Sequence, residues 1–338
     1  MMAKTSDNRI TDVPGLMVGN ADDERLLSGV TVLVGEQPFV AAADGRGGGL
    51  GTREVDALAP QGTVQEAHAI VLSGGSAFGL DAASGAQAWL RERGIGFKVR
   101  EARIPIVPSA ILFDLLNGGD KSWGRAPPYA ALAYEACEHA ARTFSLGSTG
   151  AGFGATTVCL RGGLGSASER LDDGTTIGAL AAVNPAGSVT IGARPNFWAA
   201  PFERDGEFGA RGFPSALTKA DLVPRIKGAV GESTLLAIVA TDAALDKTQA
   251  LRLAIMAQTG LARAIYPVHS PLDGDIVFAV STRAKPAPDP VHGLARLGAV
   301  AANVLARAIA RGVHAAAPAP AGWQGPPAWI ETFGEPHR

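Results

Sequence analysis

Apolar residues change their spacing along the chain between strand-like runs and helix-like repeats. Continuous apolar runs predict strands at 16–19, 29–34, 69–73, 157–160, 177–183, 235–240 and 275–280. Apolar residues three or four apart predict helices at about 80–94, 128–142, 245–262 and 293–311. The alternation has no clear linker and no internal repeat, so we expect one layered α/β sandwich over residues 1–338.

Two parts of this pattern carry further expectations. The run 235–240 has no polar position, which is typical of a strand covered on both faces. The segment from Ala315 is rich in Ala, Pro and Gly. We therefore expect residues 315–338 to form a loosely ordered tail.

Composition excludes several classes of function. The chain is 46% hydrophobic and 18% charged with a formal net charge of -2, which argues against nucleic acid as a partner. No 18-residue apolar run is present, so we expect no membrane span. The first nine residues are polar and lack an apolar signal core, which favours a cytoplasmic location.

Metal and cofactor signals are weak. Cys137 and Cys159 fit neither a disulfide framework nor a zinc site, and no histidines are paired at metal-binding spacing. The Gly-x-Gly-x-x-Ala stretch at 150–155 has no predicted strand before it and no helix after it. We therefore expect two inert thiols, no metal and no cofactor.

A hydroxyl residue stands where the buried run begins. Gly231-Glu232-Ser233-Thr234 leads directly into the apolar strand. If the bond before Thr234 opened, one residue would carry both a hydroxyl and an α-amine. An α-amine titrates near 7.7–8.0 and can act as a general base at neutral pH. Taken alone, Ser-Thr before a strand is also ordinary turn chemistry.

Polar residues at two other strand ends can complete such a site. Asp273 and Asp275 lie two apart on an extended segment, so their side chains point to one face. Two carboxylates this close favour a cation between them, and a protonated α-amine is one. Asn184 ends the strand at 177–183 and can donate an amide N–H to an oxyanion. Taken alone, the acidic pair is better explained as an exposed turn, and an asparagine before proline is also frequent in turns.

Several motifs in order resemble the DmpA/NylC-type family of L-aminopeptidase/D-esterases, β-peptidyl aminopeptidases and 6-aminohexanoate oligomer hydrolases. The resemblance runs from Ile10 to about Lys285. It rests on the segments 10–15, 45–49, 72–81, 104–108, 162–168, 237–242 and 267–275. It implies a four-layer αββα sandwich, similar to N-terminal-nucleophile (Ntn) hydrolases, that cuts itself into two chains and assembles as homotetramers.

The resemblance also implies roles for individual residues. Counting back from the 237–242 motif places the family's nucleophile on Thr234, so the cut would give an α chain of 1–233 and a β chain of 234–338. Asp273, Asp275 and Asn184 fall on the family's other site positions. Ser233 replaces the family's usual Asn or Gly and is the second choice of nucleophile.

One family position differs more strongly. A lysine of NylC-like members aligns with Cys159, and Arg161 two residues later is the replacement cation that we expect. Arginine keeps its proton and cannot act as a base.

Three functions fit these residues. The first is hydrolysis of an amide in a peptide, an amino-acid amide or ester, or a nylon-type oligomer. The second is acyl transfer to an amine, as in ornithine acetyltransferases. The third is a non-catalytic, unprocessed homologue that binds a small molecule. No residue decides between the substrates.

Overall fold

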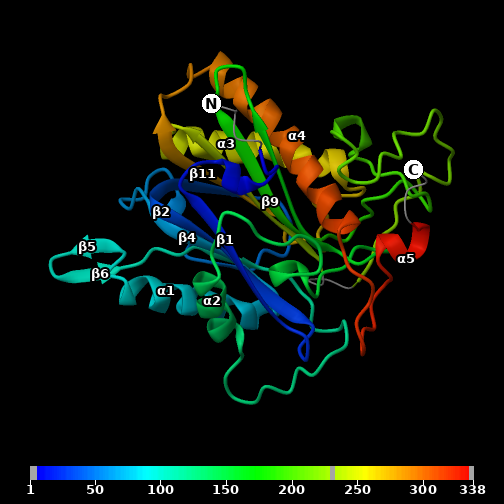
Figure 1. Ribbon diagram of the computed structural model, residues 1–338, viewed down its shortest axis with the longest axis horizontal. Coiled ribbons are helices and arrows are strands. Elements are labelled where there is room, and N and C mark those ends of the chain that lie inside the picture. Colours follow the sequence, from blue (N-terminus) through cyan, green and yellow to red (C-terminus); the bar gives the residue numbers. More distant parts are fainter. Residues whose placement is uncertain (1–5, 229–232, 335–338) are drawn as a thin grey trace.

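The computed structural model describes residues 6–228 and 233–334, and these form strands and helices in alternation (Figure 1). The strands are β1 (Leu16–Asp23), β2 (Ser28–Gly45), β3 (Thr52–Arg53), β4 (Ala67–Ser73), β5 (Phe97–Val99), β6 (Ala102–Ile104), β7 (Ser109–Ile111), β8 (Gly163–Arg170), β9 (Thr176–Asn184), β10 (Thr234–Ala243) and β11 (Ile276–Lys285). The helices are α1 (Ala82–Glu92), α2 (Tyr129–Glu138), α3 (Lys247–Ala264), α4 (His292–His314) and α5 (Trp329–Phe333).

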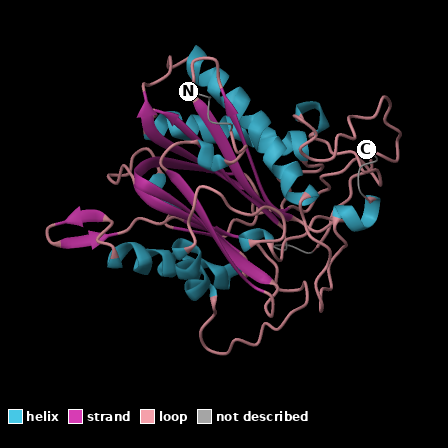
Figure 2. Ribbon diagram, viewed as in Figure 1, coloured by secondary structure: helices cyan, strands magenta, loops and turns pink. Residues whose placement is uncertain are grey.

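The long strand β2 joins two halves of the sheet. The strand order is β3-β7-β4-β2-β11-β10-β9-β8, and β1 also pairs with β2. A register shift between Val34 and Phe39 divides β2, so that its first part pairs with β1 and β4 and its last part with β11. Strands β5 and β6 form a separate hairpin that projects from the body, at the left of Figure 2.

Strand β10 shows how the layers are built, because its alternate residues enter different cores. Leu235, Ala237 and Val239 pack with residues of α3 and α4. Leu236 and Ile238 face the other way and pack with residues of β1, β2 and β4. A third core lies between β2, β4 and the helices α1 and α2. The result is two helix layers outside two sheet layers, which confirms the predicted αββα sandwich.

The glycine-rich strand β8 was not predicted, whereas a predicted strand at 157–160 is a turn region. Strand β8 lies directly against α4, and a Cβ on Gly165 would stand 1.8 Å from the Ala308 carbonyl oxygen. Gly163 approaches the carbonyl of Gly312 in the same way. The glycines therefore permit close helix–strand contact, which hydrophobic patterning does not reveal.

The C-terminal tail is more ordered than the sequence predicts. Trp329 of α5 is fully buried in the core that contains α3 and α4. The Arg161 backbone N–H donates to the Pro327 carbonyl at 2.7 Å. Buried aromatic area and backbone pairing thus fix residues 315–334, and residues 335–338 lie outside the described part of the chain.

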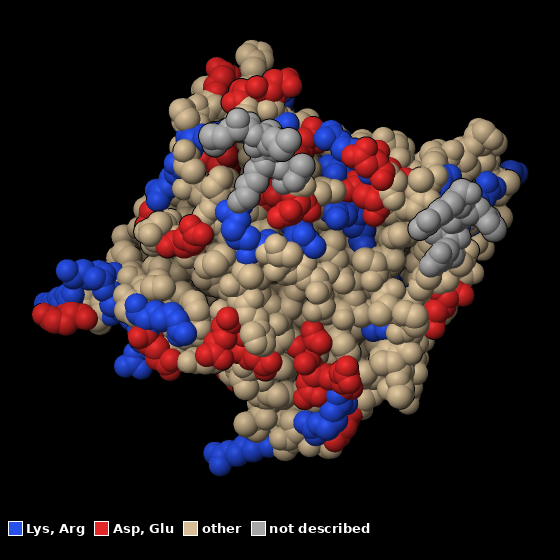
Figure 3. Space-filling model, in the orientation of Figure 1, with Lys and Arg blue, Asp and Glu red and all other residues tan. Residues whose placement is uncertain are grey.

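Helix α4 is long and apolar enough, by length and composition, to cross a membrane. However, 67% of its apolar window is buried, and the helix packs on α3, β8 and β9. Its Arg307 is buried against Glu207, with 2.5 Å between Nε and Oε1. These contacts identify α4 as a core helix. On the face shown in Figure 3, charged side chains of both signs are interspersed, which agrees with the small net charge.

The contact between β8 and α4 predicts that a methyl group added at Gly165 destabilises the protein more than one added at Gly45. Gly165→Ala forces backbone apart and is expected to lower the free energy of unfolding by about 1–3 kcal/mol. Gly45→Ala is the control, because its added Cβ meets only the side chain of half-exposed Leu50. Urea unfolding of both variants measures the difference, and equal losses would contradict this account of β8.

Candidate active site

Thr234 is the first residue of β10 and is buried between two neighbouring strands. On one edge its cross-strand partner is Asn184, the last residue of β9. On the other edge β11 runs parallel, with Leu236 paired to Ile276. The segment 273–275, which leads into β11, therefore lies beside residues 233–235. The structure brings together all four residues that the sequence singled out: Thr234, Asn184, Asp273 and Asp275.

The Ser233 carbonyl oxygen accepts two hydrogen bonds, one of them from the Thr234 hydroxyl. Thr234 Oγ1 donates to the Ser233 carbonyl oxygen at 2.6 Å. The Gly274 N–H donates to the same oxygen at 2.9 Å. A Cβ on Gly274 would lie 2.7 Å from Thr234 Oγ1 and 2.6 Å from the Gly49 carbonyl oxygen, so only glycine fits here. The site thus places a hydroxyl against a carbonyl that a backbone N–H already polarises.

Asp275 is buried next to Thr234 and Leu235 and accepts hydrogen bonds from both sides. Its Oδ1 accepts the Leu235 N–H at 2.9 Å. Its Oδ2 lies 2.9 Å from His269 Nδ1 and accepts the His269 N–H at 3.1 Å. Burial raises the pKa of Asp275 and nearby Asp273 raises it further, while the His269 contact opposes both.

Asp273 is held by a different set of donors. Its Oδ1 accepts the Ala186 N–H at 2.8 Å, from the segment that follows β9. Its Oδ2 accepts the N–H and the hydroxyl of Ser270, at 3.0 and 2.6 Å. Backbone donors therefore fix both carboxylates while their burial keeps them out of bulk water.

A glycine-rich segment after β2 fixes the loop that carries these carboxylates. The N–H groups of Arg46 and Gly49 donate to the carbonyls of Asp275 and Asp273, at 2.9 and 2.8 Å. A Cβ on Gly47 would stand 2.3 Å from both the Asp273 oxygen and the Asp275 nitrogen. This close approach explains Gly47 of the motif at 45–49, because a side chain at this position would push the acidic loop away.

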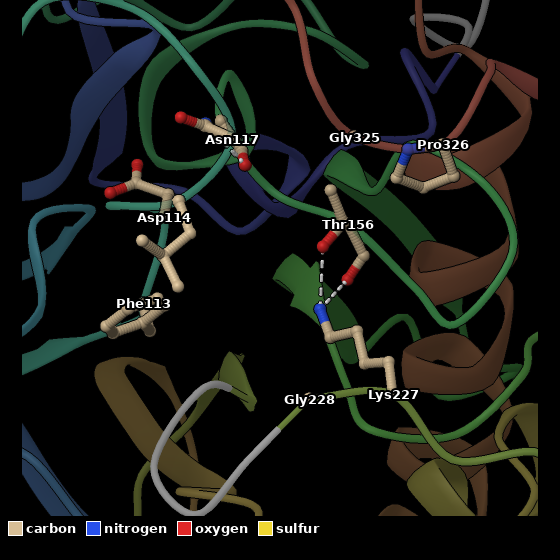
Figure 4. Close-up of a pocket in the computed structure, with 10 residues that line it drawn as sticks. Phe113, Asp114, Asn117, Thr156, Lys227, Gly228, Gly325 and Pro326 are labelled. Carbon is tan, nitrogen blue, oxygen red and sulfur yellow. Dashed lines mark hydrogen bonds between the residues drawn. The ribbon is translucent and has the colours of Figure 1, made fainter.

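The carboxamide of Asn184 is fully buried and has defined partners on each end. Its Oδ1 accepts the Thr156 N–H at 2.9 Å and Lys227 Nζ at 3.0 Å. Its Nδ2 donates to the Phe113 carbonyl at 3.1 Å. Phe113, Thr156 and Lys227 also line a cavity of about 130 Å³ (Figure 4), a volume close to that of cavities that hold a benzene ring.

Asp114 forms part of the same cavity wall. Its Oδ1 accepts the Gly75 N–H at 2.8 Å and its Oδ2 accepts the Ser28 hydroxyl at 2.6 Å. Burial raises the pKa of Asp114, and these two hydrogen bonds oppose the shift. The cavity next to Asn184 therefore has an acidic group in its wall.

Arg161, the replacement cation expected from the sequence, and Cys159 have partners of their own. The Arg161 guanidinium donates to the carbonyls of Ala317 and Pro318, both at 2.9 Å, and lies over the Trp323 ring. It therefore binds the tail. The Cys159 sulfur lies 3.8 Å from the Ser188 hydroxyl. The cation beside Asn184 is instead Lys227, which no sequence pattern indicated.

Sequence reasoning also missed the Gly274 N–H, His269 and Ser270. The only available signal was their position within the segment 267–275, which the resemblance covers as a whole. Within residues 6–228 and 233–334, no group of three His, Cys, Asp or Glu side chains could hold a metal ion.

The αββα layers are the fold of solved aminopeptidases, one of which is described as a variant of the Ntn-hydrolase fold. Peptidase family S58 matches residues 8–324. An uncharacterized aminopeptidase of Mycobacterium tuberculosis is 40% identical over 334 residues, covering 92% of this chain and 95% of that protein. The chain belongs to peptidase family S58.

More distant similarities agree with this assignment. A 6-aminohexanoate-oligomer endohydrolase of Kocuria sp. is 30% identical over 289 residues, covering 80% of this chain and 74% of that protein. A Burkholderia sp. β-aminopeptidase has a similar fold, with a TM-score of 0.71 and 22% identity over 99% of this chain and 94% of that one. An L-aminopeptidase D-Ala-esterase/amidase from Ochrobactrum anthropi has a TM-score of 0.67 and 20% identity, covering 98% of this chain and 95% of that one.

The raised pKa of Asp275 predicts a pH-dependent effect of Asp275→Asn. The folded chain holds this proton more tightly than the unfolded chain, so the stability it contributes is present at low pH and lost as pH rises through the folded pKa. The unfolding free energy of the variant minus that of its parent is therefore expected to increase as pH rises above about 4, the ordinary pKa of an aspartate. Urea unfolding at several pH values measures it.

Both proteins carry Thr234→Ala in this comparison, so that they remain the same covalent species. Asp289→Asn is the control of opposite sign. Backbone N–H groups at 291–293 lower the pKa of exposed Asp289. The unfolding free energy of Asp289→Asn minus that of its parent is therefore expected to decrease as pH rises. If the difference in unfolding free energy between Asp275→Asn and its parent does not change with pH, the Asp275 carboxyl has the same pKa in the folded and unfolded chains.

Proposed function

We propose that this chain is a self-processing amide hydrolase that cuts its own Ser233–Thr234 bond and then uses Thr234 as an N-terminal nucleophile. In the first step Thr234 Oγ1 attacks the Ser233 carbonyl carbon and gives up its proton, and the peptide nitrogen takes up a proton and leaves as the new α-amine of Thr234. The resulting ester between Ser233 and the threonine oxygen is hydrolysed by water. The products are an α chain of 1–233 and a β chain of 234–338.

The observation that carries this proposal is the geometry of the Ser233 carbonyl. Its oxygen already accepts hydrogen bonds from the Gly274 N–H and from the hydroxyl that must attack. Negative charge that develops on this oxygen during attack would therefore meet a preorganised donor. A hydroxyl held against its own preceding carbonyl also gains from proximity, because no second molecule has to be positioned.

The same groups support turnover after the cut. The α-amine of Thr234 takes the proton from Oγ1 when the hydroxyl attacks a substrate carbonyl. Asp273 and Asp275, which flank residues 233–235, supply the negative charge that holds this amine. The Gly274 N–H and the Asn184 carboxamide supply donors for the substrate oxyanion.

Replacing Thr234 tests the proposal directly. Thr234→Ala removes the nucleophile, so we expect a single chain without amidase activity, whereas the native protein gives bands of about 24 and 11 kDa from its 34.5 kDa. Electrophoresis, mass spectrometry and Edman sequencing of the smaller band measure the outcome.

Ser233→Ala is the matched control, because it keeps the scissile carbonyl and removes only the neighbouring hydroxyl. It is expected to process and to hydrolyse amides. A Thr234→Ala protein that is cut and active would sink the proposal, and an inactive Ser233→Ala protein beside it would move the nucleophile to Ser233.

We further propose that the substrate is a small aminoacyl amide with a free amine. The cavity beside Asn184 is small and has Asp114 in its wall, and relatives that are 40% identical are named as aminopeptidases. A free-amine aminoacyl p-nitroanilide is therefore expected to be cleaved at least about tenfold faster, in kcat/KM, than its N-acetyl derivative. Spectrophotometric assays measure the ratio, with 6-aminohexanoate oligomers tested in parallel. Equal rates on the blocked and free compounds would favour an endohydrolase instead.

A further inference from the structure

Lys227 brings a positive charge to the site from the segment just before the proposed cut. Its Nζ donates to Thr156 Oγ1 at 2.8 Å and also contacts the Thr156 carbonyl oxygen (Figure 4). It donates to Asn184 Oδ1 at 3.0 Å as well. All of these acceptors belong to residues 156 and 184, and Thr156 lines the cavity together with Lys227. The ammonium group therefore points at the wall of the cavity.

We infer that Lys227 is a positioning residue that orients the Asn184 carboxamide toward the nucleophile. The inference rests on the proposed function and names how one of its oxyanion donors is held. An ammonium group can only donate hydrogen bonds, so the carboxamide atom that faces Lys227 must be the oxygen. The Thr156 N–H imposes the same choice, and the Phe113 carbonyl requires Nδ2 at the other end.

The charge of Lys227 adds to this geometric effect. A cation 3.0 Å from the Asn184 oxygen draws electron density toward that oxygen. The N–H bonds at the other end of the amide then become stronger donors, because linked hydrogen bonds polarise one another in a buried site. Asn184 stands directly across from Thr234 in the β9–β10 register, so that this effect acts where an oxyanion would form.

The position of Lys227 in the chain makes the site composite. Lys227 lies upstream of Ser233, so after the cut it belongs to the α chain while Thr234 belongs to the β chain. Its backbone N–H donates to the Ala186 carbonyl at 3.0 Å, and Arg225 donates to the Gly192 carbonyl at 3.0 Å. These bonds hold the segment to the body independently of the Ser233–Thr234 peptide bond. The inferred role of Lys227 therefore persists in the mature enzyme.

Kinetics of Lys227 variants test the inference. Lys227→Met, which keeps length and loses every donor, is expected to lower kcat by roughly 10- to 100-fold with KM changed less than about threefold. The self-cleavage rate should fall as well. Lys227→Arg keeps the charge and should retain more kcat than Lys227→Gln, which keeps N–H donors only, and Lys227→Gln should retain more than Lys227→Met.

Lys219→Met is the matched control, because Lys219 is an exposed lysine of the same segment, and it should behave as native protein. Native kcat in Lys227→Met overturns the inference. Equal losses in the Arg, Gln and Met variants, together with a lower Tm, also overturn it, since they indicate a structural role. Failure of the proposed function would be recognised separately. In that case the native protein itself would stay uncut and inactive, before any lysine is changed.

Discussion

The site depends on the position of strand β10, which is paired on both edges and covered on both faces. Its neighbours β9 and β11 fix its register, and the cores on its two faces fix which side chains point each way. A slip of one residue would exchange the two cores, at a large cost in buried apolar contacts. The first residue of β10 therefore has a defined position, and the geometry around Thr234 follows from packing that extends far from it.

Much of the fold could be predicted from the hydrophobic pattern. The fully apolar run at 235–240 predicted a strand buried on both faces, and helical spacing located α1, α3 and α4. The pattern did not reveal β8, because its glycines serve contact with α4 and leave no alternation of large side chains. It also left the tail undefined, although Trp329 anchors it, since three aromatic residues (Trp323, Trp329 and Phe333) among Ala, Pro and Gly are too few to set a period.

The candidate site divides in the same way. Thr234, Asp273, Asp275 and Asn184 stand at strand ends, and strands give residues a predictable place in a sheet. Their partners come from loops: the Gly274 N–H, the glycines at 45–49, and Lys227. Backbone donors leave no mark on residue type, and the contact between Lys227 and Asn184 spans 43 residues of chain. The expected cation, Arg161, has a suitable charge, but its guanidinium binds carbonyls of the tail.

The strand order has a consequence for the life of a cleaved molecule. Strands β10 and β11 would belong to one product chain, yet they lie between β2 and β9 of the other. Neither product could dissociate without opening the middle of the sheet, so the nicked protein should stay assembled as long as it stays folded. Once denatured, however, two separate polypeptides would have to find each other again. Recovery would then depend on concentration, and heat inactivation would be governed by the rate of unfolding rather than by a reversible equilibrium.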